Sequence, residues 1–317
     1  AGFYVMIPSI HYYGQSIPEG GSGMLSESMS RFLEANGGKI LTGATFSKFL
    51  IDQGECRGVK LQDGTEIFAN SGVVSSLDPY QTYLNGFEEG VLPENFLSMV
   101  RNFSFGDVTI ARIHYALNEA PRFKNGSDMD KTAFQRMFGT LSDIDKQYNE
   151  ISRGVAPSDP FLWTAAWTTM DPTRAPEGKH TLIMDTFVPV DLANGDNWEE
   201  VAPLYIREKL LGQLRNYTTN MDDENILAEY IETGPSLERA NRCFYRGVTT
   251  GGERTLAQMG VFRPFPNYAN YRGPVKKLYM TGPSCHPGGG ISGMGTITAN
   301  EMLYDLGLKT EDDDFDF

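Results

Sequence analysis

The chain has 317 residues, of which 40% are hydrophobic and 21% charged, values typical of a folded protein long enough for two domains. Its formal net charge is -14, and no basic stripe is present to neutralise phosphates, so nucleic acid is not an expected partner. No run of about 18 apolar residues indicates a membrane-spanning helix. Residues 310–317 form an acidic tail, which we expect to be solvated.

The cysteines, Cys56, Cys243 and Cys285, are too few and too scattered for a disulfide framework or a zinc site. We therefore expect no metal site, and a reducing compartment such as the cytoplasm or the interior of an organelle. The first residues, AGFYVMIPSIHYYG, lack the basic region and the cleavage site of a signal peptide, which argues against secretion.

Residues 20–78 have a distinctive order of elements. The segment 20–23 (GGSG) opens a helix with apolar residues at helical spacing, and the segment 36–38 (NGG) ends it. Strands are expected next, with turns at Gln53-Gly54 and Asp63-Gly64. These strands cover residues 39–41, 46–51, 57–62, 65–68 and 72–75. The three-stranded meander within this series, followed by a strand that returns to a parallel sheet, is not a generic α/β order.

The middle of the chain has longer strand patterns. Residues 107–117 (DVTIARIHYAL) and 179–190 (KHTLIMDTFVPV) are predicted strands, residues 161–169 a third, and residues 198–217 are helical. Large apolar and aromatic residues are frequent here. The pattern predicts a second domain with a mixed sheet, inserted into the first.

The sequence pattern at the end of the chain is similar to that of residues 20–78. Residues 277–282 (KLYMTG) predict a strand that runs into a glycine, and a loop and a helix at 291–306 follow. Residues 288–293 (GGGISG) match the dinucleotide fingerprint G-x-G-x-x-G, but the strand does not precede them directly and no second strand follows. The start of this helix still suits an anionic or electron-rich ligand, because its N–H groups are unpaired there.

Two segments carry a family resemblance. Residues 19–50 (EGGSGMLSESMSRFLEANGGKILTGATFSKFL), continued by residues 58–79 (GVKLQDGTEIFANSGVVSSLDP), resemble the second FAD-domain block of phytoene desaturases. Residues 278–303 (LYMTGPSCHPGGGISGMGTITANEML) resemble their C-terminal block. The segments SDPFLWTAAWTTMDPTRAPEGKHTLIMDTFVPV and VFRPFPNYANYRGPVKKLY also match, so the resemblance covers nearly the whole chain. It extends to proteins of pyridine nucleotide–disulfide oxidoreductase type and to retinol saturase.

The resemblance implies an α/β fold: part of an FAD/NAD(P)-binding, glutathione-reductase-like Rossmann domain with an inserted mixed-sheet α+β substrate domain. Residues 1–18 would be a linker or the end of a substrate-domain segment. The FAD-binding domain would comprise residues 19–78 and 276–309, with the substrate-binding domain at 79–275 and the acidic tail after them.

The resemblance also implies FAD as cofactor. The backbone of Phe46 would pair with the adenine, although valine is usual there. Gly282 and Ser284 would lie near the phosphate or ribityl region, although related flavoproteins often carry an acidic residue in place of Ser284. The helix start would face the flavin N1–O2 edge. The implied cofactor residues are Phe46, Gly282, Ser284, Gly290, Ile291, Ser292, Gly293 and Met294.

Catalytic and substrate residues are less defined. His286 and Arg263 are the catalytic candidates, with the alternatives that His286 only shapes its loop and that Arg263 forms a salt bridge. Trp163 and Tyr271 are candidates for a substrate tunnel, but core packing explains them equally well. The glycines at 288–290 have the alternative of a close helix–sheet crossing. His114 is expected to be structural.

The implied function is an FAD-dependent oxidoreductase that moves a hydride between flavin N5 and a hydrophobic, polyene- or isoprenoid-like substrate. A flavin-assisted polyene isomerase and a non-catalytic structural or assembly subunit remain as alternatives, and peripheral membrane contact is compatible with such substrates. Family members begin with a G-x-G-x-x-G block that has no counterpart in this sequence. We therefore expect the chain to be either a fragment of a longer polypeptide or one subunit of a split enzyme whose partner is an N-terminal-half polypeptide carrying that motif. In both cases we expect residues 1–317 alone to hold FAD weakly.

Overall fold

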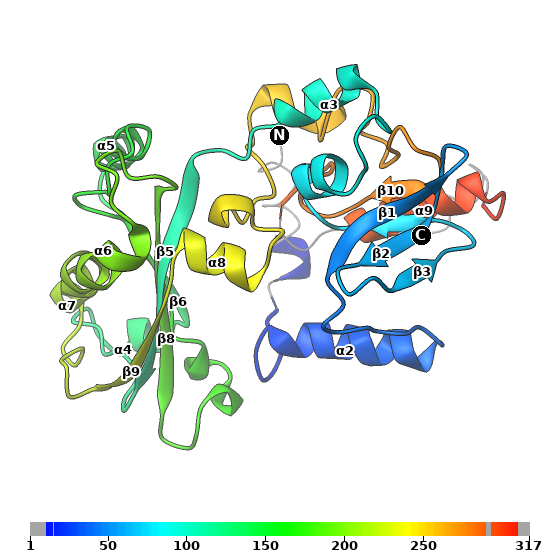
Figure 1. Cartoon of the computed structure of the whole chain (residues 1–317). Coiled ribbons are helices and arrows are strands. Elements are labelled where there is room, and N and C mark those ends of the chain that lie inside the picture. The colour runs from blue at the N-terminus through cyan, green and yellow to red at the C-terminus, as the bar shows by residue number, and fades with distance from the viewer. Residues whose placement is uncertain (1–10, 15, 290–292, 310–317) are drawn as a thin grey trace.

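The computed structural model describes residues 11–14, 16–289 and 293–309, which form two parts, each with its own sheets (Figure 1). The helix predicted after residue 22 is α2 (Gly23–Ala35). A three-stranded antiparallel sheet follows, and it consists of β1 (Phe46–Asp52), β2 (Glu55–Leu61) and β3 (Glu66–Phe68). The meander is therefore confirmed.

The turn between β1 and β2 has positive φ at both Gln53 and Gly54, as a tight hairpin turn requires. The strand expected at 39–41 is wrong. No strand in the described residues pairs with this segment, and Ile40 and Leu41 are exposed. A short apolar run without a neighbouring strand has no ladder to join.

A parallel pair joins distant parts of the sequence. β4 (Val73–Ser75) lies beside β10 (Leu278–Met280), with Val74 opposite Tyr279. Both strands were predicted. Around the pair is a core with buried members from both ends of the chain, including Phe49, Phe96, Phe265, Leu278 and Met294.

The second part contains a five-stranded sheet in the order β6-β7-β8-β5-β9. Its strands are β5 (Val108–Leu117), β6 (Phe134–Met137), β7 (Leu162–Ala165), β8 (His180–Pro189) and β9 (Ile226–Glu232). All strand pairs in this sheet are antiparallel, whereas a mixed sheet was expected here. The strand predicted at 161–169 stops at Ala165 and gives way to a 3-10 turn (Trp167–Thr169), because β6 offers β7 only four partners.

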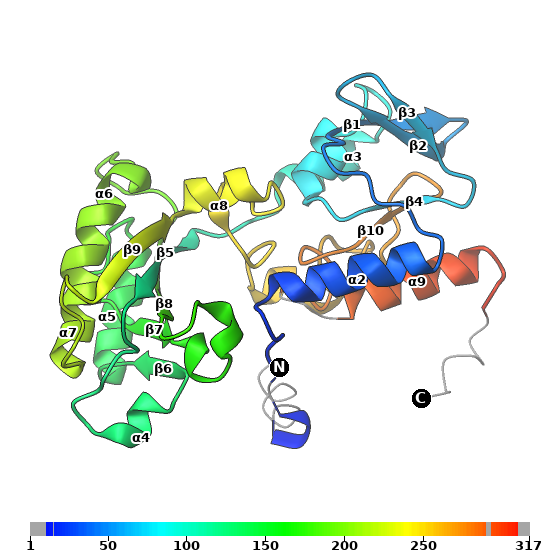
Figure 2. The same ribbon diagram turned by 90° about the horizontal axis from the view of Figure 1, so that it is seen from below.

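Helices cover one face of this sheet. The helix predicted at 198–217 consists of α6 (Trp198–Tyr205), a π-helical stretch (Ile206–Leu211) and α7 (Gly212–Tyr217). Together with α5 (Leu141–Ile151), they lie on one side of the strands, and the opposite face of the sheet is turned toward the rest of the chain (Figure 2). The remaining helices are α3 (Glu94–Arg101), α4 (Ser127–Asp130), α8 (Gly234–Ala240) and α9 (Met294–Asp305).

Burial alternates along β5 and β8, as a sheet covered on one face requires. Ile113, Leu182 and Met184 are buried against the helices. On the other face, His114 Nε2 lies 2.8 Å from a Glu232 carboxylate oxygen, so the imidazole has a side-chain partner within the sheet.

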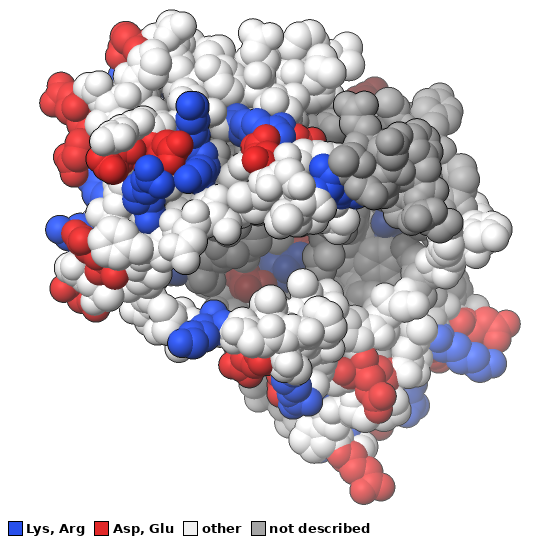
Figure 3. Space-filling view, turned by 90° about the vertical axis from the view of Figure 1, so that its right-hand side faces the viewer, with Lys and Arg blue, Asp and Glu red and all other residues white. Residues whose placement is uncertain are grey.

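Figure 3 shows the side of the molecule that carries β3 and α9, with acidic and basic side chains interspersed and a hollow near the centre. None of the helices in the described residues combines the length and the apolar character that a membrane span needs.

Candidate functional site

The turn between β10 and α9 holds most of the predicted site residues. The Thr281 N–H donates to the Ser75 carbonyl at 2.8 Å, which extends the pairing of β4 and β10 by one residue. Gly282 follows at a φ of 96°, in the left-handed region that favours glycine. The Cys285 N–H then donates back to the Gly282 carbonyl at 3.0 Å. The chain thus leaves the sheet in a tight turn toward α9.

Arg263 fixes the shape of this turn from inside. Its side chain is 1% exposed, and its guanidinium donates to the carbonyls of Pro283 (2.7 Å), Glu253 (3.0 Å) and Thr250 (3.2 Å). Burial lowers the pKa of Arg263 to about 10, and the nearby Arg254 adds to this shift, but the group remains charged near neutral pH. The guanidinium therefore donates to backbone carbonyls, and none of these contacts is the salt bridge given as an alternative for Arg263.

Two glycines of the turn lie directly over arginine side chains. A Cβ at Gly288 would come within 2.7 Å of Arg263 Nε, and a Cβ at Gly289 would collide with the Arg254 guanidinium. Both glycines also have positive φ. These close contacts are with arginine side chains, so at Gly288 and Gly289 they are not the helix–sheet crossing that was the alternative for 288–290.

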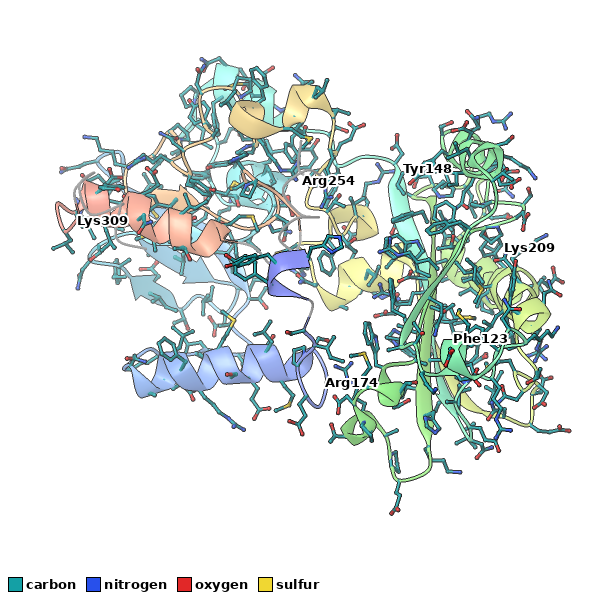
Figure 4. All side chains as sticks on the ribbon, turned by 180° about the vertical axis from the view of Figure 1, so that it is seen from behind. Phe123, Tyr148, Arg174, Lys209, Arg254 and Lys309 are labelled. Carbon is teal, nitrogen blue, oxygen red and sulfur yellow. The ribbon has the colours of Figure 1, made fainter. Side chains whose placement is uncertain are left out.

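Arg254 was not singled out from the sequence, where no motif or periodicity marks it. It is exposed, and no hydrogen bond or ion pair to it occurs within the described part of the chain. Figure 4 places it between the two parts of the molecule. An unpaired cation therefore lies against the glycine turn.

The other residues of the turn differ in exposure. Ser284 and Cys285 are 3% and 1% exposed, and burial raises the pKa of Cys285 to about 12, which keeps this thiol protonated. His286 is exposed, and its carbonyl accepts a hydrogen bond from the Tyr271 hydroxyl. Tyr271 itself is 4% exposed and belongs to the core around β10, so it presents little surface to a substrate.

The structure describes only part of the segment that leads into α9. Gly290, Ile291 and Ser292, three of the predicted cofactor residues, lie outside the described residues. Gly293 precedes the helix, and a Cβ there or at Gly295 would have no atom of the described residues within 4 Å. The Met294 side chain is 5% exposed and packs inward. The helix therefore begins with open space on one side.

The far end of α9 is tied to the sheet. Arg272 Nε donates to an Asp305 carboxylate oxygen at 2.9 Å, and the Tyr279 hydroxyl donates to the same carboxylate at 2.7 Å. Hydrogen bonding from Arg272 lowers the pKa of Asp305. These contacts hold α9 in register with β10, and sequence reasoning did not anticipate them.

The remaining predicted residues lie apart from the turn. Phe46 begins β1, an edge strand, and its ring lies 4.7 Å from that of Phe49 within the same core. Trp163 lies on β7, opposite Asp185 of β8, and therefore on the sheet face that the helices leave uncovered. No cluster of metal-ligating side chains occurs among the described residues.

Comparisons with known proteins place this geometry in context. A subunit of limonene dehydrogenase from Castellaniella defragrans is 29% identical over 313 residues, which cover 93% of this chain and 56% of that protein. Pyridine nucleotide-disulfide oxidoreductase domain-containing protein 2 from Mus musculus is 27% identical over 299 residues, 91% of this chain and 51% of that protein. The lycopene-forming phytoene desaturase of a Paracoccus species is 27% identical over 297 residues, with coverages of 91% and 55%. The chain spans about half the length of the curated relatives it matches.

No family model matches the chain. Among solved structures, an oxidoreductase from Methanosarcina mazei aligns with a TM-score of 0.57 at 19% identity and covers 95% of this chain and 58% of that chain. This likeness concerns the fold alone, which is α/β and Rossmann-like, as predicted.

Proposed function

We propose that the chain is a member of the phytoene-desaturase-like oxidoreductases, to which it is similar over most of its length, and that it forms the flavin-facing and substrate-facing part of an FAD-dependent enzyme. The proposed reaction moves a hydride between flavin N5 and a hydrophobic, polyene- or isoprenoid-like substrate. The hydride exchange is chemistry that the flavin supplies when it is bound. The residues of this chain bind, orient and shield the reactants.

The open side of the α9 N-terminus is the observation that carries this proposal. Gly288 and Gly289 leave no room for side chains on the arginine side, whereas a Cβ at Gly293 or Gly295 would contact none of residues 11–14, 16–289 and 293–309. A flat ring can approach the helix start on that open side. There, unpaired N–H groups and the positive end of the helix dipole would stabilise negative charge at the flavin N1–O2 edge.

Arg254 strengthens the same electrostatic effect. Its unpaired guanidinium lies against Gly289, and a nearby positive charge favours the anionic form of any group that enters. We therefore assign Arg254 to the cofactor side of the site, as a positioning charge. Arg263 holds the turn through its hydrogen bonds to backbone carbonyls. His286 remains the catalytic candidate because it is exposed.

An apolar substrate is supported by the uncovered face of the five-stranded sheet. Aromatic rings gather there: Phe187 lies 5.6 Å from Trp163, and Phe134 stacks on Trp167 at 6.1 Å. Such a surface suits a hydrocarbon, and limonene and phytoene appear in the names of two relatives. The substrate itself is part of the proposal.

We further propose that α2 packs against polypeptide that carries the pyrophosphate-binding motif, in the same chain or in another. None of the side chains of α2 is buried, although Met29, Phe32 and Leu33 are 60%, 70% and 52% exposed. An apolar helix face of this kind normally lies against a partner. The relatives have the length for such a partner.

The test is the pair of variants Gly293→Val and Gly212→Val. Gly293 has φ of -69° and free space around it, so a valine is tolerated by the fold but blocks the approach of a flat ring. Gly212 is the control, because its Cβ would make only an ordinary contact, 3.7 Å from the Arg207 carbonyl oxygen. We expect Gly293→Val to weaken flavin binding about tenfold or more, with the melting temperature unchanged, and Gly212→Val to change neither.

Flavin absorbance of the purified protein, in complex with the motif-bearing polypeptide, measures occupancy, and calorimetry measures stability. Full occupancy and turnover in Gly293→Val would refute the cofactor role of the turn.

A further inference from the structure

A pocket lies at the outer edge of the five-stranded sheet and shares no residue with the glycine turn. Its volume is about 370 Å³, within the range of small-molecule sites. Its apolar wall consists of Phe123, Met129, Phe134, Met137, Phe138 and Tyr217. It is formed by β6, the segment around α4 and the end of α7, so it does not depend on the glycine turn or on any cofactor.

Several large apolar side chains of this pocket are exposed, beside the polar lining residues Asn125, Thr132 and Gln135. Met129 and Phe134 are 37% exposed, Tyr217 is 45% exposed and Phe138 is 46% exposed. Exposed apolar side chains scattered singly are normal, but several gathered in one concave site indicate a binding surface. A ligand with a hydrocarbon body would cover them.

Arg136 lines the same pocket, and no acidic side chain among the described residues pairs with it. Its guanidinium lies 4.4 Å from the centre of the Trp163 ring and 5.1 Å from that of Phe134. Within the described part of the chain, no hydrogen bond or ion pair to Arg136 occurs. The aromatic rings hold the cation by stacking and leave its N–H groups available.

The strand register explains why Arg136 remains unpaired. Across the sheet, Arg136 pairs with Trp163, Trp163 with Asp185, and Asp185 with Arg112. Asp185 is thus two strands, or about 10 Å, from Arg136, and Arg112 already donates to it at 2.7 Å. The tryptophan separates the cation from the nearest carboxylate of its row. The buried indole N–H of Trp163, which has no partner among the described residues, adds another unsatisfied donor beneath the guanidinium.

We propose that this pocket binds a small apolar carboxylate, with its hydrocarbon part against the aromatic wall and its carboxylate on Arg136. A planar guanidinium presents parallel N–H groups that match the two oxygens of a carboxylate. The stacking on Trp163 fixes the guanidinium before the ligand arrives, which reduces the entropy cost of binding. Neither flavin nor the polypeptide that covers α2 is needed for this site.

The experiment compares decanoate with 1-decanol, which share a hydrocarbon tail and differ in charge. Isothermal titration of the full chain, in whatever complex it purifies with, should show decanoate bound about tenfold more tightly or better. Arg136→Gln should remove this preference and leave the affinity for 1-decanol within about twofold of wild type. Phe138→Ala should weaken both ligands, because it removes part of the shared apolar wall.

Arg153→Gln is the matched control. Arg153 is exposed, follows α5, and donates to the Asn149 carbonyl outside the pocket, so its replacement should leave both affinities unchanged. Circular dichroism checks that each variant is folded. The proposal is overturned if the wild type binds the two ligands equally or binds neither, or if folded Arg136→Gln keeps its preference for decanoate. The flavin occupancy of Arg136→Gln should equal that of wild type, so a failure here is distinct from a failure of the proposed function.

Discussion

The glycine turn shows why particular residues are required at particular positions. Gly288 and Gly260 both have positive φ, but only Gly288 lies against a buried guanidinium, whereas a Cβ at Gly260 would meet nothing within 4 Å. Alanine at either position carries the cost of a left-handed backbone, about 1–2 kcal/mol. At Gly288 the methyl group must also displace Arg263, which has several carbonyl partners.

We therefore expect Gly288→Ala to lower the free energy of unfolding by about 1–3 kcal/mol more than Gly260→Ala does. Urea denaturation of both variants measures this difference. Equal losses at the two positions would show that the turn can move away from Arg263.

At the same scale, the sequence identified the glycines but not what they contact. Gly288 and Gly289 were singled out by their spacing, whereas Arg254 lies far from Gly289 in the sequence, and only the tertiary fold brings the two together. The contacts of Asp305 with Arg272 and Tyr279 were missed for the same reason. Local sequence patterns identify positions where the backbone requires glycine. The contacts that explain this requirement come from residues far away in the sequence.

Elements were predictable where their determinants are local. The β1–β2 hairpin follows from Gln53-Gly54, a turn signal within the predicted segment. The strand expected at 39–41 and the full length of the strand at 161–169 were wrong, since strand length depends on partners elsewhere in the chain. The π-helical stretch Ile206–Leu211 also lacked a sequence signal.

The Asp171 carboxylate links the segment after β7 to the residues that precede α2, and this contact depends on pH. Asp171, after β7, accepts a hydrogen bond from the Gly20 N–H at 2.8 Å, and Arg174 donates to the Pro18 carbonyl at 2.8 Å. Figure 4 shows Arg174 close to the start of α2. Hydrogen bonds from Thr173 and Arg174 lower the pKa of Asp171 to about 2.

Because this pKa is depressed in the folded state, the carboxylate stabilises the fold above its unfolded pKa of about 4, and the contribution is lost as the pH falls toward 2. Asp171→Asn should therefore lower the melting temperature at pH 6 and narrow its difference from wild type by pH 3. Thermal unfolding at both values measures this. A constant difference between the two proteins across that range would contradict the assignment.

At the scale of the whole molecule, we propose residues 79–275 as an inserted domain between two segments of one flavin-binding unit. The two buried cores support an inserted domain but with narrower borders, since Ile113 and Met184 belong to its core, whereas Phe96 and Phe265, both within 79–275, pack in the core around β4 and β10. The exposed apolar face of α2 belongs to the flavin-binding unit. This face is one of the apolar surfaces that the described residues leave uncovered.

Replacing Met29 and Phe32 together by glutamine should reduce the binding of a hydrophobic dye by the isolated chain and weaken its association with the motif-bearing polypeptide. Leu204→Gln is the control, because Leu204 is 62% exposed on α6, in the other part of the molecule. Dye fluorescence and co-purification measure the two effects. Association that survives the double replacement would exclude α2 as the contact.

The parallel pairing of β4 with β10 also constrains how the molecule forms. The two strands are separated by roughly 200 residues, and the entropy of closing so long a loop opposes their meeting until the insert has become compact. Pairing of these strands is then a late event, and the insert acts as a spacer that brings their ends together. A substitution in the insert's core, such as Leu214→Ala, would consequently be observed as slow formation of the flavin site, although Leu214 belongs to a different core.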